Sequence, residues 1–301
     1  MKVTRLPELA VHAPGEAPPC RVAIGTFDGL HVGHREVIRG NDTVLTFDPH
    51  PLSVIHPEAT PKLVMPFAIK RDLIAGLGVE ELVVIPFDRE FADRSAESFV
   101  EEVLIGQLGA TSVSVGENFR FGQAARGTPE LLGARPEFET RVVPLVEVAG
   151  ETVSSSQIRG LVAAGEVRKA AQFLGGPFLL EGEVVHGDKR GRGLGMPTAN
   201  IVPDDRLVAP GHGFYAGWAH GYPAAVNVGV RPTFETGRGL LVEPYLIGFE
   251  GDLYGETLRV AFVERLRGER RFESVEALVE QMHRDAELAE QICARTRYEA
   301  A

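Results

Sequence analysis

The stretch AIGTFDGLHVGHREVI, residues 23–38, decides the fold of the first half of the chain. An apolar strand over 21–25 leads into a turn that contains glycine, and only the short segment 35–39 can be helical before glycine and asparagine follow. His31 and His34 therefore stand where a strand gives way to a helix. In parallel α/β sheets, ligands bind at turns of this kind.

Further apolar segments continue the alternation of strand and helix. We predict strands over 43–47, 81–87, 111–119 and 141–148, helices over 66–78 and 95–108, and a helix pair over 154–175. The alternation predicts an α/β domain of Rossmann-like type with a doubly wound parallel sheet. The polar clusters GTFDGLHVGH, DPHP and GENFRFG each follow an apolar strand, which predicts a binding site at the carboxyl ends of the strands.

The second half of the chain has a different pattern. From residue 178 onward, short apolar runs alternate with glycine turns and without helices between them, which is typical of a small antiparallel β-barrel. A long helix over 274–298, capped by Ser274, is predicted to follow. We expect two domains, 1–174 and 175–301.

Composition excludes several classes of protein. The chain of 301 residues has a net charge of −11, so it lacks the cationic footprint of a nucleic-acid-binding protein. Its two cysteines form no disulfide framework, and no apolar run reaches the roughly 18 residues of a membrane span. The first residues carry proline and charges where a signal peptide would be apolar. We expect a cytoplasmic protein that binds small molecules, with no nucleic acid, membrane or obligate protein partner.

Besides histidines that are simply solvated or packed in the core at a turn, the pair has two functional interpretations. Metal ligation by His31 and His34 would require a third ligand and closed geometry. Alternatively, Gly25, Gly29 and Gly33 permit close approach of the backbone, and a helix N-terminus favours an anion. Two imidazoles there can stabilise charge on a triphosphate attacked at its α-phosphorus. This second interpretation predicts nucleotidyl transfer.

A second polar segment, VSSSQIR at 153–159, precedes an apolar helix. Its serines are a strong N-cap signal, and capping alone explains them equally well. The hydroxyls of Ser155 and Ser156, followed by Arg159, also offer donors to a β- or γ-phosphate.

Together, HVGH at 31–34 and VSSSQIR resemble the HxGH and ISSTxIR motifs of the nucleotidylyltransferase superfamily. With TFDPHP at 46–51 and GENFRFG at 116–122, the first half resembles the FMN adenylyltransferase module of prokaryotic FAD synthetases. The resemblance implies catalytic roles for His31, His34 and Arg159 on ATP, contacts with ATP at Gly25, Phe27, Ser155 and Ser156, and FMN near Asp48 and Asn118. The segment 35–45 is shorter than that family leads us to expect.

The stretch GEVVHGDKRGRGLGMPTANI, 182–201, carries a second set of candidates. Gly187, Lys189, Arg190, Arg192 and Gly195 predict either a loop that folds over phosphates or a flexible basic hairpin. Thr198 and Asn200 stand two apart, on one side of an extended chain, and offer hard oxygen ligands for Mg²⁺.

GRGLGMPTAN, 191–200, closely resembles the signature of riboflavin kinases, and GFYAG at 213–217 and NVGVRPTF at 227–234 follow in the same order. The resemblance covers the second half of the chain. It implies that Glu243 is the general base for the ribityl 5′-hydroxyl and that Thr198 and Asn200 hold Mg²⁺ with ATP. It also implies that Arg267 and Tyr215 lie near the flavin.

The sequence therefore predicts a bifunctional enzyme that uses ATP and Mg²⁺. The second half would phosphorylate riboflavin to FMN, and the first half would adenylylate FMN to FAD with release of pyrophosphate. A riboflavin kinase whose first domain binds FMN or nucleotide without turnover is an alternative, motivated by the short 35–45 segment. A flavin-sensing regulatory protein is a second alternative.

Overall fold

The structure, a computed structural model, describes residues 1–8, 18–186, 195–231 and 239–296. The chain divides into two compact units. Unit 1 consists of Met1–Pro61 and Phe67–Ser154, and unit 2 consists of Lys62–Pro66 and Ser155–Ala301. The short segment of unit 2 that comes from the first half pairs through Leu63, in a parallel bridge with Leu207.

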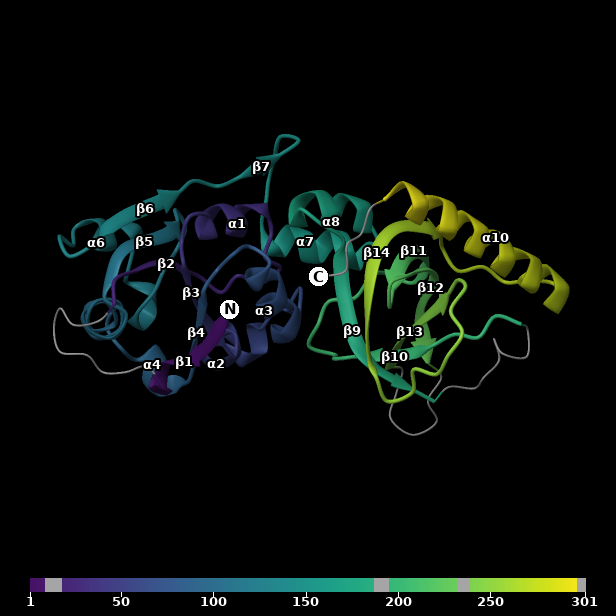
Figure 1. Ribbon diagram of the computed structural model, residues 1–301, viewed down its shortest axis with the longest axis horizontal. Coiled ribbons are helices and arrows are strands. Elements are labelled where there is room, and N and C mark those ends of the chain that lie inside the picture. The colour runs from purple at the N-terminus through teal and green to yellow at the C-terminus, as the bar shows by residue number, and fades with distance from the viewer. Residues whose placement is uncertain (9–17, 187–194, 232–238, 297–301) are drawn as a thin grey trace. The chain divides into compact units, whose positions relative to one another are not determined.

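Unit 1 is built on a six-stranded parallel sheet in the order β1-β4-β3-β2-β5-β6 (Figure 1). Its strands are β1 (Lys2–Arg5), β2 (Cys20–Ile24), β3 (Thr43–Asp48), β4 (Glu81–Pro86), β5 (Ala110–Gly116) and β6 (Glu139–Val143). The strand order reverses at β2, because β3 pairs on one side of it and β5 on the other. The predicted parallel sheet is confirmed, and its switch point lies between the carboxyl ends of β2 and β5.

Short helices connect these strands. They are α1 (Val32–Ile38), α2 (Pro51–Ile55), α3 (Phe67–Ala75), α4 (Arg89–Ala92), α5 (Ala96–Ser98) and α6 (Pro129–Gly133), with a π-helix over Phe99–Gln107. Short 3₁₀ turns occupy Leu6–Glu8, Pro57–Ala59 and Gln123–Ala125. Ser95 caps α5 by accepting a hydrogen bond from the Ser98 amide, as the predicted helix over 95–108 requires. Phe99, Val103 and Leu104 then bury their side chains in the core with Val22 and Val113.

Two strand predictions differ from the structure. The edge strand β1 was not predicted, because only Thr4 of its four residues is buried and the segment shows no apolar alternation. The strand predicted over 141–148 ends at Val143, and a separate hairpin of β7 (Glu147–Val148) and β8 (Glu151–Thr152) follows. Pro144, which cannot donate to a ladder, lies between them.

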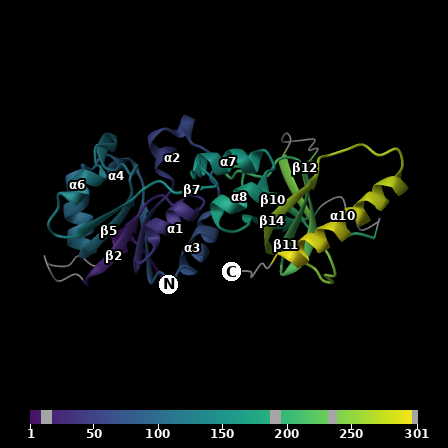
Figure 2. The same cartoon turned by 90° about the horizontal axis from the view of Figure 1, so that it is seen from above.

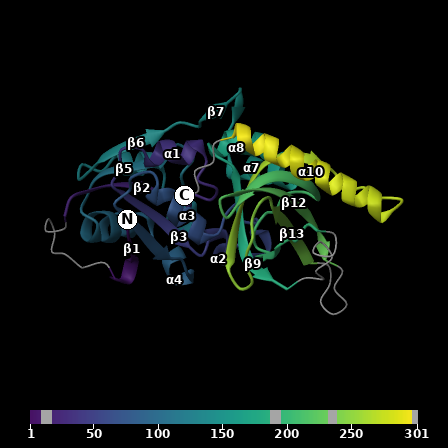
Figure 3. The same cartoon turned by 45° about the vertical axis from the view of Figure 1, so that its right-hand side comes forward.

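Unit 2 contains a closed antiparallel barrel of six strands in the order β10-β13-β12-β11-β14-β9. The strands are β9 (Phe178–Val185), β10 (Asn200–Pro203), β11 (Gly213–Ala219), β12 (Tyr222–Arg231), β13 (Gly239–Leu246) and β14 (Thr257–Arg267). The long helix α10 (Val275–Arg295) packs on β11 and β12 (Figure 3), and Ser274 caps it as predicted. The predicted barrel and final helix are confirmed.

The predicted helix pair forms α7 (Ser155–Ala163) and α8 (Val167–Leu174), which contact each other (Figure 2). Both helices belong to unit 2, where α8 packs on β14 and the Gly211 amide donates to the Val162 carbonyl at 3.2 Å. The division into compact units therefore falls after Ser154. The limits 1–174 and 175–301 for the two functional domains stay a prediction.

Candidate active sites

The turn between β2 and α1 has a strained backbone. Phe27, Gly29 and Leu30 have φ angles of 49°, 88° and 39°. The Phe27 and Leu30 side chains are fully buried, which holds two residues other than glycine in a left-handed conformation that they rarely adopt. Core packing therefore fixes the backbone of this turn and thereby the positions of His31 and His34, which follow it.

His31 and His34 lie against each other at the end of this turn. Their ring centroids are 3.6 Å apart with 18° between the planes, and His31 Nδ1 accepts a hydrogen bond from the His34 amide at 3.3 Å. Burial lowers the pKa of His31 to about 4. Burial, and then the charges of His31 and Lys70, lower the pKa of His34 well below its usual value. Both imidazoles are therefore neutral at pH 7.

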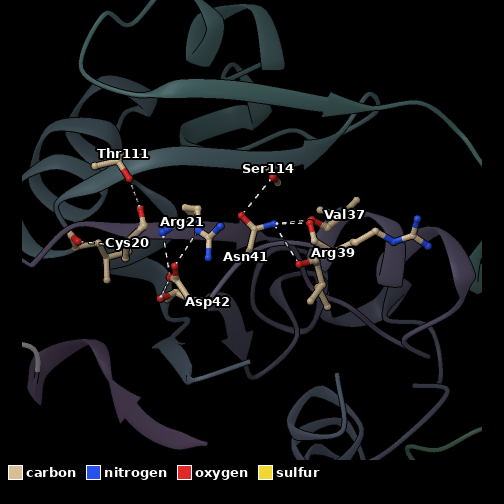
Figure 4. A network of polar contacts seen from close by, with 11 residues as sticks. Cys20, Arg21, Val37, Arg39, Asn41, Asp42, Thr111 and Ser114 are labelled. Carbon is tan, nitrogen blue, oxygen red and sulfur yellow. Dashed lines mark hydrogen bonds and ion pairs between the residues drawn. The ribbon is translucent and has the colours of Figure 1, made fainter. Parts of the chain in front are cut away.

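A network of hydrogen bonds caps the C-terminal end of the short helix α1 (Figure 4). The Asn41 side-chain amide donates to the carbonyls of Val37, Ile38 and Arg39, and its Oδ1 accepts from Ser114 on β5. Asp42 accepts from the backbone and the side chain of Arg21 on β2. The segment 35–45 is thus short but firmly tied to both neighbouring strands.

A cavity of about 760 Å³ opens at the switch point of the sheet. Gly25, Phe27 and His34 line it after β2, and Asn118 lines it after β5. Parallel strands bring their carboxyl ends to one edge, so residues predicted from distant motifs meet here. Asp48 ends the neighbouring strand β3.

The aromatic wall of this cavity was missed by sequence reasoning. It consists of Phe47, Phe87, Phe91, Phe99, Phe119 and Phe121. Phe119 and Phe121 stack with centroids 5.4 Å apart, and Arg94 lies 5.3 Å above the Phe91 ring. The phenylalanines that follow β4 and β5 were the available signal, since they stand where the predicted site lies. A wall of rings suits a planar aromatic ligand.

Ser155, Ser156 and Arg159 lie on α7, in unit 2. Nη2 of Arg159 donates to Oγ of Ser156 at 3.1 Å, so the two polar groups form one cluster. The predicted action of this cluster on the same ATP as the histidine pair stays a prediction.

In the barrel, Glu243 lies on β13 between two asparagines. Asn227 of β12 is its direct partner, and Nδ2 of Asn227 donates to Oε2 of Glu243 at 3.0 Å. On the other side Ile201 pairs with Val242, and continuing this register by one residue places Asn200 beside Glu243. Three polar residues thus stand in a row across β10, β13 and β12.

This row fits a cation or a hydroxyl. Oδ1 of Asn227 is buried and has no hydrogen-bond partner among the described residues. Asn200 is buried, and Thr198 is half-exposed just before β10. Amide, carboxylate and hydroxyl oxygens are the donors that Mg²⁺ takes from proteins, so the residues present fit the predicted ion. Asn227 was not predicted, because strand register was needed to find it.

The predicted phosphate loop is mostly outside the described residues. Gly187, Lys189, Arg190 and Arg192 fall in that gap. Gly195 is described, with a φ of 79° that favours glycine.

The two residues predicted near the flavin have structural partners. Arg267 forms a buried ion pair with Asp285 of α10, with 2.6 Å between Nη2 and Oδ2, and its guanidinium lies 3.7 Å above the Phe214 ring. Tyr215 has no exposed surface and donates to the Gly211 carbonyl. The position of Arg267 and Tyr215 near the flavin stays a prediction.

No helix in the described ranges has both the length and the apolar character needed to cross a membrane.

Comparison with known proteins covers both halves. The riboflavin kinase family model, Flavokinase, matches residues 174–293, and the FAD synthetase model, FAD_syn, matches residues 13–157. A bifunctional riboflavin kinase/FMN adenylyltransferase of Listeria monocytogenes is 34% identical over 88% of this chain and 89% of its own. The protein of that name from Escherichia coli K12 is 34% identical, over 91% of this chain and 94% of its own.

A relative of the same name from Bacillus subtilis 168 is 35% identical over 89% of this chain and 90% of its own length. Among solved structures, a Streptococcus pneumoniae protein described as a macrolide-efflux protein matches with a TM-score of 0.84 and 31% identity. That match covers 96% of this chain and 99% of the other. With relatives this similar over nearly its whole length, the chain belongs to the family of bifunctional riboflavin kinase/FMN adenylyltransferases.

Proposed function

We propose that this chain catalyses both reactions of its family, each with a separate set of residues. Unit 2 phosphorylates riboflavin with ATP to give FMN and ADP. The cavity of unit 1 adenylylates FMN with ATP to give FAD and pyrophosphate. The observation that carries the proposal is the coincidence of two polar clusters, around Glu243 and around His31, with the segments that the two families match.

In the kinase reaction, Glu243 accepts the proton of the ribityl 5′-hydroxyl while that oxygen attacks the γ-phosphorus of ATP. Asn227 orients the carboxylate through its hydrogen bond to Oε2. Thr198 and Asn200 hold Mg²⁺, which when bound neutralises charge on the ATP phosphates.

In the adenylyl transfer, a phosphate oxygen of FMN attacks the α-phosphorus of ATP, and pyrophosphate leaves. Neutral His31 and His34 donate ring N–H groups to phosphate oxygens as negative charge grows on them. Gly25 and Phe27 border the phosphates, while Asn118 and Asp48 lie on the FMN side.

The test follows FMN and FAD separately after riboflavin, ATP and Mg²⁺ are supplied. Glu243→Ala is expected to abolish FMN formation and to keep the conversion of supplied FMN to FAD. His31→Ala is expected to do the reverse. Glu250→Ala, a loss of an exposed acid beyond β13, is the matched control and should leave both reactions unchanged.

Three outcomes would contradict the proposal. Loss of both reactions in either folded variant would show that the two sets of residues are not separate. Kinase turnover without any FAD from supplied FMN would leave a riboflavin kinase with a binding domain. Tight FMN binding with neither reaction would leave a flavin sensor.

A further inference from the structure

Lys70 is a buried cation for which the mechanism above has no use. It lies on α3, and its residue is only 9% exposed. Of the lysines and arginines whose side-chain burial the structure describes, none other is buried to this extent. Burying an ammonium group costs several kcal/mol unless partners compensate for the lost water, so the position of Lys70 needs an explanation.

The first partner of Lys70 is the backbone of the turn between β2 and α1, residues 25–31, which we call the histidine turn. Its Nζ donates to the Thr26 carbonyl at 2.8 Å, and the fully buried Thr46 hydroxyl donates to the same carbonyl at 3.2 Å. Thr26 directly precedes Phe27, where the backbone takes its left-handed conformation. Two donors on one carbonyl therefore fix the start of the turn that leads to His31 and His34.

Two carboxylates also act on Lys70 through their charge. Burial lowers the pKa of Lys70, and the charges of Asp28 and Asp48 raise it. Asp28 is itself 3% exposed on the histidine turn, and Asp48 ends β3. Negative charges that follow the neighbouring strands β2 and β3 thus favour the charged form of the ammonium group.

We propose that Lys70 is a positioning residue for adenylyl transfer, acting through the Thr26 carbonyl and through its charge on the turn that carries His31 and His34. The proposal rests on the reaction assigned above to unit 1. Nζ of Lys70 donates its hydrogen bond to the backbone of the turn, so Lys70 acts through the turn and not on the substrate.

The charge of Lys70 has a specific consequence for the histidines. The charges that act on His34 come from His31 on the same turn and from Lys70 on α3, while Asp28 and Asp48 act on Lys70 in turn. A fixed positive charge opposes protonation of an imidazole nearby. Burial is the main reason that the pKa of His34 is low, and the charge of Lys70 adds to it. Lys70 therefore helps to keep His34 in the neutral form, which offers an N–H donor without a buried positive charge.

The test compares three substitutions of Lys70. Lys70→Met removes both the donor and the charge, Lys70→Gln keeps a donor but removes the charge, and Lys70→Arg keeps both. Arg71→Met is the matched control, because Arg71 is the exposed neighbour on α3 and pairs with Asp72. Phosphorylation of riboflavin by unit 2 reports that each variant is folded and active.

We expect Lys70→Met to lower kcat for FAD formation about tenfold to a hundredfold, as for a misplaced reacting group. In Lys70→Gln the acid limb of the pH profile should move to higher pH, because His34 loses a repelling charge. Lys70→Arg should restore the acid limb, and Arg71→Met should leave rate and profile unchanged. Wild-type kcat and an unmoved acid limb in folded Lys70→Met and Lys70→Gln would overturn the proposal.

A second readout needs no activity. NMR titration of ¹⁵N-labelled histidine in the full chain reports the protonation of His34 directly. The wild-type ring should stay neutral well below the pH at which an ordinary histidine titrates, and Lys70→Gln should raise the pKa of His34. A wild-type His34 that titrates at its ordinary value overturns the proposal even if no variant folds. If FAD formation itself fails while the titration behaves as expected, the proposed function is wrong and the effect of Lys70 on the turn stands.

Discussion

The side-chain amide of Asn227 donates a hydrogen bond to Oε2 of Glu243 at 3.0 Å, between directly paired residues of β12 and β13. The bond fixes the orientation of the Glu243 carboxylate. The side-chain oxygen of Asn227, Oδ1, is buried and has no hydrogen-bond partner in the described chain. An acceptor and a potential base are therefore held together by two rigid strands.

Asn227→Ala should lower kcat for riboflavin phosphorylation about tenfold to a hundredfold, because a hydrogen bond to a charged group contributes about 1.5–3 kcal/mol. Asn227→Asp should lower it further, since two carboxylates would then face each other. Steady-state kinetics with riboflavin and ATP measures both effects, and FAD formation from supplied FMN is the internal control. An unchanged kcat in Asn227→Ala would show that Glu243 needs no such support.

Gly33→Ala should impair adenylyl transfer without unfolding unit 1. A Cβ at this position would lie 3.2 Å from two atoms of the His31 ring, so the ring must shift by a few tenths of an ångström. We expect a loss of FAD formation on the order of tenfold, because catalysis depends on sub-ångström placement. Gly133→Ala on α6 meets no atom within 4 Å and is the control. Equal rates in the two variants would contradict this expectation.

The stability of unit 1 should fall as the pH is lowered from 6.5 to 4. In the folded state the pKa of His31 is about 4, below the value of about 6.5 in an unfolded chain. The unfolded state thus binds more protons than the folded state in this pH window. As the pH falls, each such histidine lowers the free energy of unfolding by about 1.4 kcal/mol per pH unit. Urea unfolding at pH 7.5, 6 and 5 measures the slope. His31→Asn should flatten it, and a slope that is the same with and without His31 would refute the assignment.

Asp285→Asn should lower the melting temperature of the barrel unit. The ion pair of Arg267 and Asp285 has side chains that are only 16% and 6% exposed, and removing one partner of a buried pair costs about 3–5 kcal/mol. Calorimetry of the full chain measures this loss.

Arg267→Met separates the ion pair with Asp285 from the predicted contact with the flavin. A higher Michaelis constant for riboflavin with an unchanged melting temperature would support the flavin contact over the structural role.

The sequence predicted the strands of both units where apolar alternation was strong, and it placed the histidine turn and GENF at the same edge of the sheet. It could not predict that Lys70 points inward, because a lysine on a helix is ordinarily solvent-exposed. Nor could it pair Asn227 with Glu243, since a strand register is set by the folded barrel and a shift of one residue reverses every side chain. Tyr215 was placed near the flavin because of its motif, although core packing buries it completely.

The bridge between Leu63 and Leu207 affects how this polypeptide can be dissected in the laboratory. The Leu63 amide donates to the Arg206 carbonyl, and the Leu63 carbonyl accepts from the Val208 amide, both at 2.8 Å. A gene fragment that started after residue 174 would omit the segment Lys62–Pro66 together with α7 and α8. A stand-alone kinase fragment should therefore be designed to begin at Ser155 and to carry a grafted copy of Lys62–Pro66, so that these backbone groups keep their partners.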